Sequence, residues 1–283
     1  MRDELKLMNR IEKAPKAYEN RDFIHSRDGR TIRILSEYLY PEQNFRKRNI
    51  NRAIIFFGSA RSYSRMQHKQ EEESLGRLIK DAVGADKELI EAKIAALKLK
   101  KEVTEYYEDA RNLSKKFCQW SKKMKEDQKF YICSGGGPGI MEAANRGAFE
   151  CGEPNIGLNI SLPFEQEPNQ YISPDLNFEF HYFFMRKLWF VDIASAFIVF
   201  PGGYGTMDEL FEILTLQQTL KVQRPIPVVL YSEKFWKNLI NFEMMVQLGT
   251  IKREDLNLFK FANSVEEAYN HVTKELKHIY KLK

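Results

Sequence analysis

The chain has 283 residues and a mass of 33.3 kDa, which at roughly 150 residues per domain allows one large domain or two small ones. Hydrophobic residues make up 43% of it and charged residues 29%, and its 20 Phe, 13 Tyr and 3 Trp exclude a disordered chain. The formal net charge of +5 suits an anionic ligand such as phosphate but is too small to indicate nucleic-acid binding.

Neither the cysteines nor the N-terminus indicates export. Cys118, Cys133 and Cys151 have no spacing typical of a metal site or a disulfide framework, which favours a reducing compartment and predicts no metal site. Residues 1–22 carry acids and bases throughout and lack the apolar region of a secretory signal. The longest apolar stretch, residues 190–200, is interrupted by Asp192 and is shorter than the roughly 18 residues that cross a bilayer. We therefore expect a cytoplasmic protein with no membrane or nucleic-acid partner.

Residues 1–50 are charged and mixed, and we interpret them as an N-terminal extension. They contain one strand-like piece at residues 31–35, after an Asp28-Gly29 turn signal. Residues 53–57, AIIFF, then form a continuous apolar run that ends in the sequence GSAR at residues 58–61. Such a run is typical of a parallel strand buried on both faces that stops at a glycine turn, so we expect the core domain to begin here.

Residues 66–128 are charged and helical in pattern, which indicates an insertion into this domain. Gly84 predicts a break between two helices. After it, apolar residues recur at alternating spacings of three and four, a seam that predicts one long amphipathic helix. The C-terminal half of the seam fits packing on the core, whereas the alanine-rich N-terminal half fits a second copy equally well, so we expect a homo-oligomer, at least a dimer. The seam consists of Leu89, Ala92, Ala96, Leu99, Val103, Tyr106, Ala110, Leu113, Phe117, Trp120 and Met124.

The rest of the chain alternates short apolar runs with helical patterns. This alternation predicts βαβ units, and hence a doubly wound α/β fold with a parallel sheet and helices on both faces, in a single domain over residues 51–283. Ligands of such sheets bind outside the carboxyl ends of the strands. The predicted strands are 130–133, 156–160, 178–182, 196–200 and 226–230, and the predicted helices are 139–151, 185–194 and 206–220.

Two glycine-rich loops each follow a predicted strand and open a predicted helix. Glycine lets backbone N–H groups approach a ligand closely, and the helix behind the loop supplies uncapped N–H donors and a positive dipole end. One such loop would be explained equally well by a tight turn, but two favour a phosphate site. The loops are SGGGPG at residues 134–139, with Gly135, Gly136 and Gly137, and PGGYGT at residues 201–206, with Gly202, Gly203, Gly205 and Thr206.

The common nucleotide fingerprints are missing from both loops. The Walker pattern needs Lys-Ser/Thr after its glycines, and other residues follow the glycines in both loops, which disfavours ATP hydrolysis. The G-x-G-x-x-G dinucleotide motif is only partly imitated, so a dinucleotide-dependent oxidoreductase is a weaker alternative.

Four charged residues near the loops are candidates for the chemistry. Glu209 follows Thr206 by three residues, in the first turn of its predicted helix, but the same spacing is that of a capping box. Arg186 and Lys187 lie at the start of a predicted helix, where their charge opposes the dipole, so they indicate either an anionic partner or a surface pair. Glu142 fits a dipole partner of its own helix as well as a ligand to a sugar hydroxyl.

Residues 201–209, PGGYGTMDE, match the pattern PGGxGTxxE. Together with GSAR at 58–61, SGGGPGIMEAANRGA at 134–148 and MRK at 185–187, this sequence resembles the Lonely Guy (LOG) family, whose members carry the older label of possible lysine decarboxylases. The match covers about residues 53–231 apart from the helical insertion. The resemblance implies a Rossmann-like homodimer that hydrolyses the N-glycosidic bond of a nucleoside 5′-monophosphate to free base and ribose 5-phosphate, with AMP as the common bacterial substrate and cytokinin ribotides as the plant-type ones.

By position, the resemblance makes Arg186 and Glu209 the catalytic pair. It assigns the phosphate loop to Gly202, Gly203, Gly205 and Thr206, and nucleotide-binding positions to Ser59, Gly136 and Glu142. The neighbouring residues predicted to bind phosphate or nucleotide are Gly58, Gly135, Gly137 and Lys187. The chain departs from the compact plant-type pattern in its N-terminal extension, its helical insertion and Glu142, which leaves the base specificity and the oligomer open.

The chemistry of this reaction fits the catalytic pair. Cleavage of a ribosyl C–N bond builds oxocarbenium character, which a carboxylate such as Glu209 can stabilise, or for which it can orient water. Arg186 can hold the phosphate or ribose in register. No lysine stands out for a Schiff base, which disfavours decarboxylation, and we expect no cofactor. The alternative is a non-catalytic nucleotide-binding or cofactor-carrier protein that uses the same two loops.

Overall fold

The computed structural model describes residues 14–99, 101–163 and 167–282. Contacts divide the chain into two units, the first ending at Tyr40 and the second beginning at Pro41. In the first unit, α1 (Arg21–His25) is followed by the start of α2 (Arg30–Lys47), and the side chain of Arg33 donates to the carbonyl of Ser26 (2.7 Å). This bond ties the first turn of α2 to the end of α1.

The strand expected at residues 31–35 is wrong, because these residues lie within α2. Their β-branched side chains imitate a strand over a short window. Over a longer window, however, Ile32, Leu35 and Leu39 recur at the spacing of a helix. All three side chains are exposed in the described chain, so burial gives no support for the strand interpretation.

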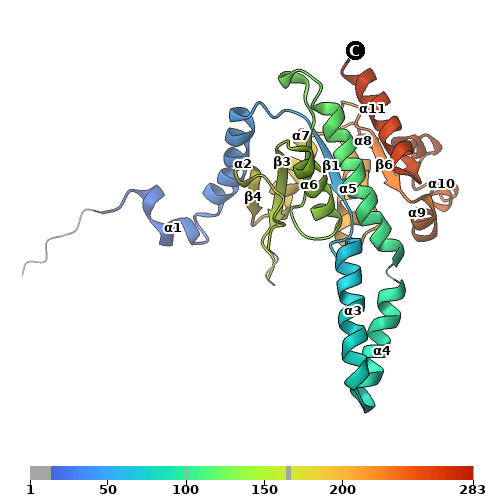
Figure 1. The fold of residues 1–283 in the computed structure, drawn as a ribbon. Coiled ribbons are helices and arrows are strands. Elements are labelled where there is room, and N and C mark those ends of the chain that lie inside the picture. The colour runs from blue at the N-terminus through green and yellow to red at the C-terminus, as the bar shows by residue number, and fades with distance from the viewer. Residues whose placement is uncertain (1–13, 100, 164–166, 283) are drawn as a thin grey trace, which may run out of the picture. The chain divides into compact units, whose positions relative to one another are not determined.

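Seven parallel strands form one sheet in the order β4-β3-β2-β1-β5-β6-β7 (Figure 1). The order reverses between β1 and β5, so the loops after these two strands run to opposite sides and leave a crevice at the carboxyl edge. The Rossmann-like, doubly wound α/β fold is therefore confirmed. The strands are β1 (Ala53–Phe57), β2 (Tyr131–Ser134), β3 (Asn155–Ile160), β4 (Asn177–Phe180), β5 (Ala194–Val199), β6 (Val228–Tyr231) and β7 (Lys260–Ala262).

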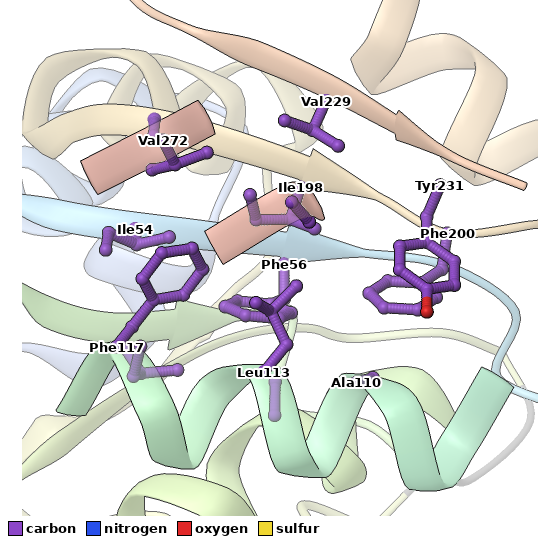
Figure 2. Close-up of a cluster of buried hydrophobic side chains, with 14 of the residues drawn as sticks. Ile54, Phe56, Ala110, Leu113, Phe117, Ile198, Phe200, Val229, Tyr231 and Val272 are labelled. Atoms are coloured by element: carbon purple, nitrogen blue, oxygen red, sulfur yellow. The ribbon is translucent and has the colours of Figure 1, made fainter. Parts of the chain in front are cut away.

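Helices cover both faces of the sheet because alternate side chains of each strand point to opposite faces. On one face, Figure 2 shows Leu113 and Phe117 of α5 (Lys101–Ser121) directed toward Ile54 and Phe56 of β1. The same core includes residues of α6 (Ile140–Cys151) and α11 (Val265–Ile279). On the other face, Phe57 of β1 contacts Phe190 of α7 (Phe183–Ile193), with ring centroids 4.9 Å apart.

The insertion between β1 and β2 consists of α3 (Arg65–Asp81), α4 (Gly84–Leu99) and α5. A capping box of Ser64 and Gln67 starts α3, and the break expected at Gly84 is confirmed. Figure 1 shows α3 and α4 side by side, extending beyond the sheet, while α5 runs along it. The expected long helix is described as α4 and α5, on either side of residue 100, which lies outside the described residues. Packing of its C-terminal half on the core is confirmed, since Leu113 and Phe117 are fully buried.

The C-terminal elements complete the sheet. They are α8 (Tyr204–Gln218), α9 (Glu233–Leu239), α10 (Phe242–Gln247), β7 and α11. Of these, α8 and the end of α9 line the cavity described below. The sequence patterns predict neither β7, which has three residues, nor the short helices before it. No helix in the described ranges has the length and apolarity needed to cross a membrane.

Candidate active site

A cavity of about 810 Å³ lies at the crevice between the loops after β1 and β5. Its volume falls within the range of small-ligand sites, roughly 300 to 1,000 Å³. The loop after β1 (residues 57–61) and the loop after β5 with the start of α8 (residues 202–207) form much of its lining. Both glycine loops reach the cavity, as the strand order requires.

The loop after β1 is tied to both neighbouring loops through Ser59. Its N–H donates to the carbonyl of Pro201 (3.0 Å), and its carbonyl accepts from the N–H of Ile140 (3.0 Å), which starts α6. Gly58 lies against the Ile140 side chain, where a Cβ would approach to 2.7 Å. The predicted residues Gly58 and Ser59 therefore line the cavity, and their contacts also connect the loop after β1 to Pro201 and to the start of α6.

The N-terminus of α8 opens into the cavity without a side-chain cap. Gly203 is its N-cap, and no described protein group accepts from the N–H groups of Gly205 and Thr206. A Cβ at Gly203 or Gly205 would meet nothing within 4 Å, and neither glycine has positive φ. No steric contact within the protein therefore requires glycine at these two positions. A ligand that approaches the backbone closely would require it.

The capping-box interpretation of Thr206 and Glu209 is wrong, because α8 begins at Tyr204 and both residues lie inside the helix. Glu209 accordingly belongs to the second turn rather than the expected first turn. Thr206 is buried against Gly202, where a Cβ would lie 2.1 Å from the Thr206 hydroxyl oxygen. Being three residues apart, Thr206 and Glu209 share one face of α8, and both line the cavity.

Arg186 and Glu209 form a buried ion pair inside the cavity. Arg186 Nη2 lies 3.4 Å from Glu209 Oε1, and the two side chains are 13% and 6% exposed. The guanidinium lies 5.4 Å and 5.6 Å from the ring centroids of Phe183 and Phe190. Arg186 Nε is buried and has no hydrogen-bond partner among the described residues. The structure thus brings together the two residues predicted as catalytic, and it leaves the Nε–H of Arg186 without a protein acceptor.

Burial controls the protonation of this pair. It raises the pKa of Glu209 to about 7, although the positive charges of Arg186 and Lys187 act to lower it. Burial also lowers the pKa of Arg186, although Glu209 acts to raise it. Because loss of water outweighs mutual attraction for both groups, Glu209 can exchange a proton near neutral pH.

Only the first glycine of the triple-glycine loop lines the cavity. Gly135 does so beside Met141, whereas Gly136 has a φ of 75° and lies against Asn159. The buried amide of Asn169 donates to the carbonyls of Gly136 (2.9 Å) and Gly137 (3.1 Å). The structure therefore places Gly136 and Gly137 in the support of the loop.

Two other predicted residues lie outside the cavity lining. Glu142 accepts a hydrogen bond from the Tyr107 hydroxyl (2.6 Å), which joins α6 to α5. Lys187 pairs with Asp208 (2.8 Å) and Glu212 (3.1 Å) of α8. Lys187 therefore has acidic partners on α8 and makes no contact with the cavity.

Sequence reasoning missed the apolar wall of the cavity. This wall consists of residues that lie far apart in the chain and form no common motif, namely Phe57, Phe190, Met141 and Ile240. Arg61 also lines the cavity, and its place at the end of the GSAR motif of residues 58–61 is a signal that could have indicated this. No group of three His, Cys, Asp or Glu that could hold a metal occurs in the described part of the chain.

Comparison with known proteins finds relatives for part of the chain. A family model described as "Possible lysine decarboxylase" matches residues 141–272. The chain is 28% identical over 155 residues to a rice protein (Oryza sativa subsp. japonica) named probable cytokinin riboside 5′-monophosphate phosphoribohydrolase LOG4, covering 54% of this chain and 66% of the relative. It is 27% identical over 142 residues to LOG1 of Arabidopsis thaliana, covering 48% and 63%. The chain thus spans just under two thirds of these relatives' own length.

Solved structures show more distant likenesses. The Moco carrier protein of Chlamydomonas reinhardtii aligns with a TM-score of 0.44 and 17% identity, covering 80% of this chain and 98% of its own. A structural-genomics target aligns with a TM-score of 0.43 and 20% identity, covering 62% and 91%.

Proposed function

We propose that the chain belongs to the Lonely Guy (LOG) family, whose members it is similar to, and that it hydrolyses the N-glycosidic bond of a nucleoside 5′-monophosphate, with AMP as the first substrate to test. The products are the free base and ribose 5-phosphate. Cytokinin ribotides, after which the plant relatives are named, form the second group to test.

The 5′-phosphate binds at the N-terminus of α8. The open space at Gly203 and Gly205 admits a ligand to the backbone, and the free N–H groups and helix dipole favour an anion there. Thr206, buried beneath Gly202, holds the loop in this shape. Binding energy from the phosphate then positions the ribose carbon that reacts.

The buried pair of Arg186 and Glu209 is the observation that carries the proposal of hydrolysis. As the C1′–N bond breaks, positive charge develops on the ribose, and the Glu209 carboxylate stabilises it. With a pKa of about 7, Glu209 can also accept the proton of the water whose oxygen bonds to C1′. The base leaves with the electron pair of the C1′–N bond and takes up one proton, so that the water is fully consumed. Arg186 orients Glu209 and offers its unpartnered Nε–H to the substrate. The apolar wall, including Phe57 and Phe190, provides a surface for the departing base.

The test is to incubate the purified protein with a panel of nucleoside 5′-monophosphates and to detect free base by chromatography. We expect AMP to be cleaved far faster than adenosine, because adenosine lacks the group that α8 binds. Equal rates with both would contradict the assignment of the phosphate loop. Tight nucleotide binding without release of base from any monophosphate would instead support the alternative, a non-catalytic binding protein.

A further inference from the structure

We propose, on the basis of the function above, that Arg61 determines specificity for the phosphate, and that its guanidinium is the charge that distinguishes a nucleotide from a nucleoside in this cavity. The N-terminus of α8 offers the phosphate backbone N–H groups but no charged side chain, and Arg61 adds a full positive charge beside them. Arg61 is a binding residue, apart from the bond that breaks.

The position of Arg61 is set by the hydrogen bonds of its loop. Its N–H donates to the Ser59 hydroxyl (3.1 Å), and Ser59 is itself bonded to Pro201 at the end of β5. Arg61 is exposed and lines the same cavity as Gly203 and Gly205. A long cationic side chain therefore lines the same cavity as the N-terminus of α8.

The charges of the cavity leave Arg61 uncompensated. Its charged lining residues are Arg61, Arg186 and Glu209, and the last two neutralise each other at 3.4 Å. None of the ion pairs among the described residues includes Arg61. The charge of the cavity is therefore positive, and Arg61 is its cation outside this pair.

Acidic residues lie near this loop, but another arginine occupies them. Arg65, at the start of α3, pairs with Glu105 (2.5 Å), and its N–H donates to Glu108 (3.1 Å). Glu105 and Glu108 of α5 thus both have Arg65 as a partner. The Arg61 guanidinium remains available for an anionic ligand, and guanidinium matches the geometry of phosphate in a bidentate contact.

The experiment measures binding of ribose 5-phosphate, AMP and adenosine by calorimetry to the full-length protein and to Arg61→Ala and Arg61→Lys. A charge-assisted hydrogen bond predicts that Arg61→Ala weakens ribose 5-phosphate and AMP about tenfold to a hundredfold. Arg61→Lys should recover part of the loss, because it keeps the charge without the planar fork. Adenosine binding should stay within about twofold of the unmodified protein in every variant, since adenosine carries no phosphate for the charged group to pair with.

Arg77→Ala is the matched control, because Arg77 is an exposed arginine on α3 outside the cavity and its loss changes the net charge equally. It should bind all three ligands as the unmodified protein does. Unchanged ribose 5-phosphate affinity in Arg61→Ala, an equal loss for adenosine, or no ribose 5-phosphate binding by the unmodified protein would each overturn the role of Arg61. If binding depends on Arg61 but no monophosphate releases its base, only the proposal of hydrolysis is overturned. If Arg61→Ala leaves turnover unchanged, only the role of Arg61 is overturned.

Discussion

At the scale of single residues, Glu209 is the group whose replacement separates catalysis from binding. Glu209→Gln keeps the shape of the side chain but cannot hold the charge that stabilises an oxocarbenium-like transition state. We expect turnover of AMP to fall by at least about two orders of magnitude while nucleotide affinity stays within a few-fold. Steady-state kinetics and calorimetry measure the two effects. Glu212→Gln, which alters a carboxylate of the same helix outside the cavity, serves as the control, and retained turnover in Glu209→Gln would exclude the catalytic role.

The raised pKa of Glu209 also links stability to pH. The folded state holds this proton up to about pH 7, whereas an unfolded glutamic acid loses it near its ordinary pKa of about 4.3. The free energy of unfolding therefore falls as pH rises through this window, and Glu209→Gln escapes the loss. Urea unfolding at pH 5 and pH 8 measures this effect. From pH 5 to pH 8, the free energy of unfolding of Glu209→Gln should rise relative to that of the unmodified protein by at most about 3 kcal/mol. A difference that does not change with pH would show that Glu209 is not buried as a titrating acid.

At the scale of elements, we expect the N-terminus of α8 to bind the phosphate. Gly203→Val should leave the fold intact apart from about 1 kcal/mol for the altered N-cap, since the position has open space and an extended φ of −95°. Its branched side chain would fill the space in which the phosphate meets the backbone, so we expect nucleotide binding to be lost. Gly76→Val is the control, because Gly76 also has nothing within 4 Å but lies in α3. Thermal unfolding and calorimetry on both variants provide the comparison, and normal affinity in Gly203→Val would rule out this phosphate site.

At the scale of the whole molecule, we expect a homo-oligomer that uses the exposed side of α4. Leu89 and Leu99 are 57% and 84% exposed, although they belong to an apolar seam. Replacing both with Glu should weaken assembly before it unfolds the monomer, because neither side chain contributes to the core. Light scattering across a concentration series measures the change.

Leu97→Glu provides the contrast for this experiment. Leu97 is 5% exposed, so a charge there should destabilise the packing of α3 against α4 rather than act on assembly alone. A monomer at micromolar concentration in the unmodified protein would reject the oligomer, and the exposed leucines would then be ordinary surface residues.

Local patterns of the sequence determined much of the fold. The apolar run of β1 and the alternation of strands with helices after β2 predicted the parallel sheet, because a strand buried on both faces must be apolar throughout. Both glycine loops and the pair of Arg186 and Glu209 were predicted as well, since their motifs are short and contiguous. The same local view failed at residues 31–35, where β-branched residues occur in a helix, and at β7, which is too short to carry a pattern.

Only the tertiary structure decided which candidates share a cavity. Strand order brought the loops after β1 and β5 together, and Arg61 and Ile240 line one cavity although they are far apart in the chain. A hydrogen bond from Asn169 holds the carbonyl of Gly137 away from the cavity lining. Lys187 pairs with Asp208 and also lies outside the lining. The pKa of Glu209 depends on burial, which arises when α7 and α8 pack on the sheet. Spacing along the chain encodes local conformation, whereas loss of water and the choice of partner depend on atoms that distant segments contribute.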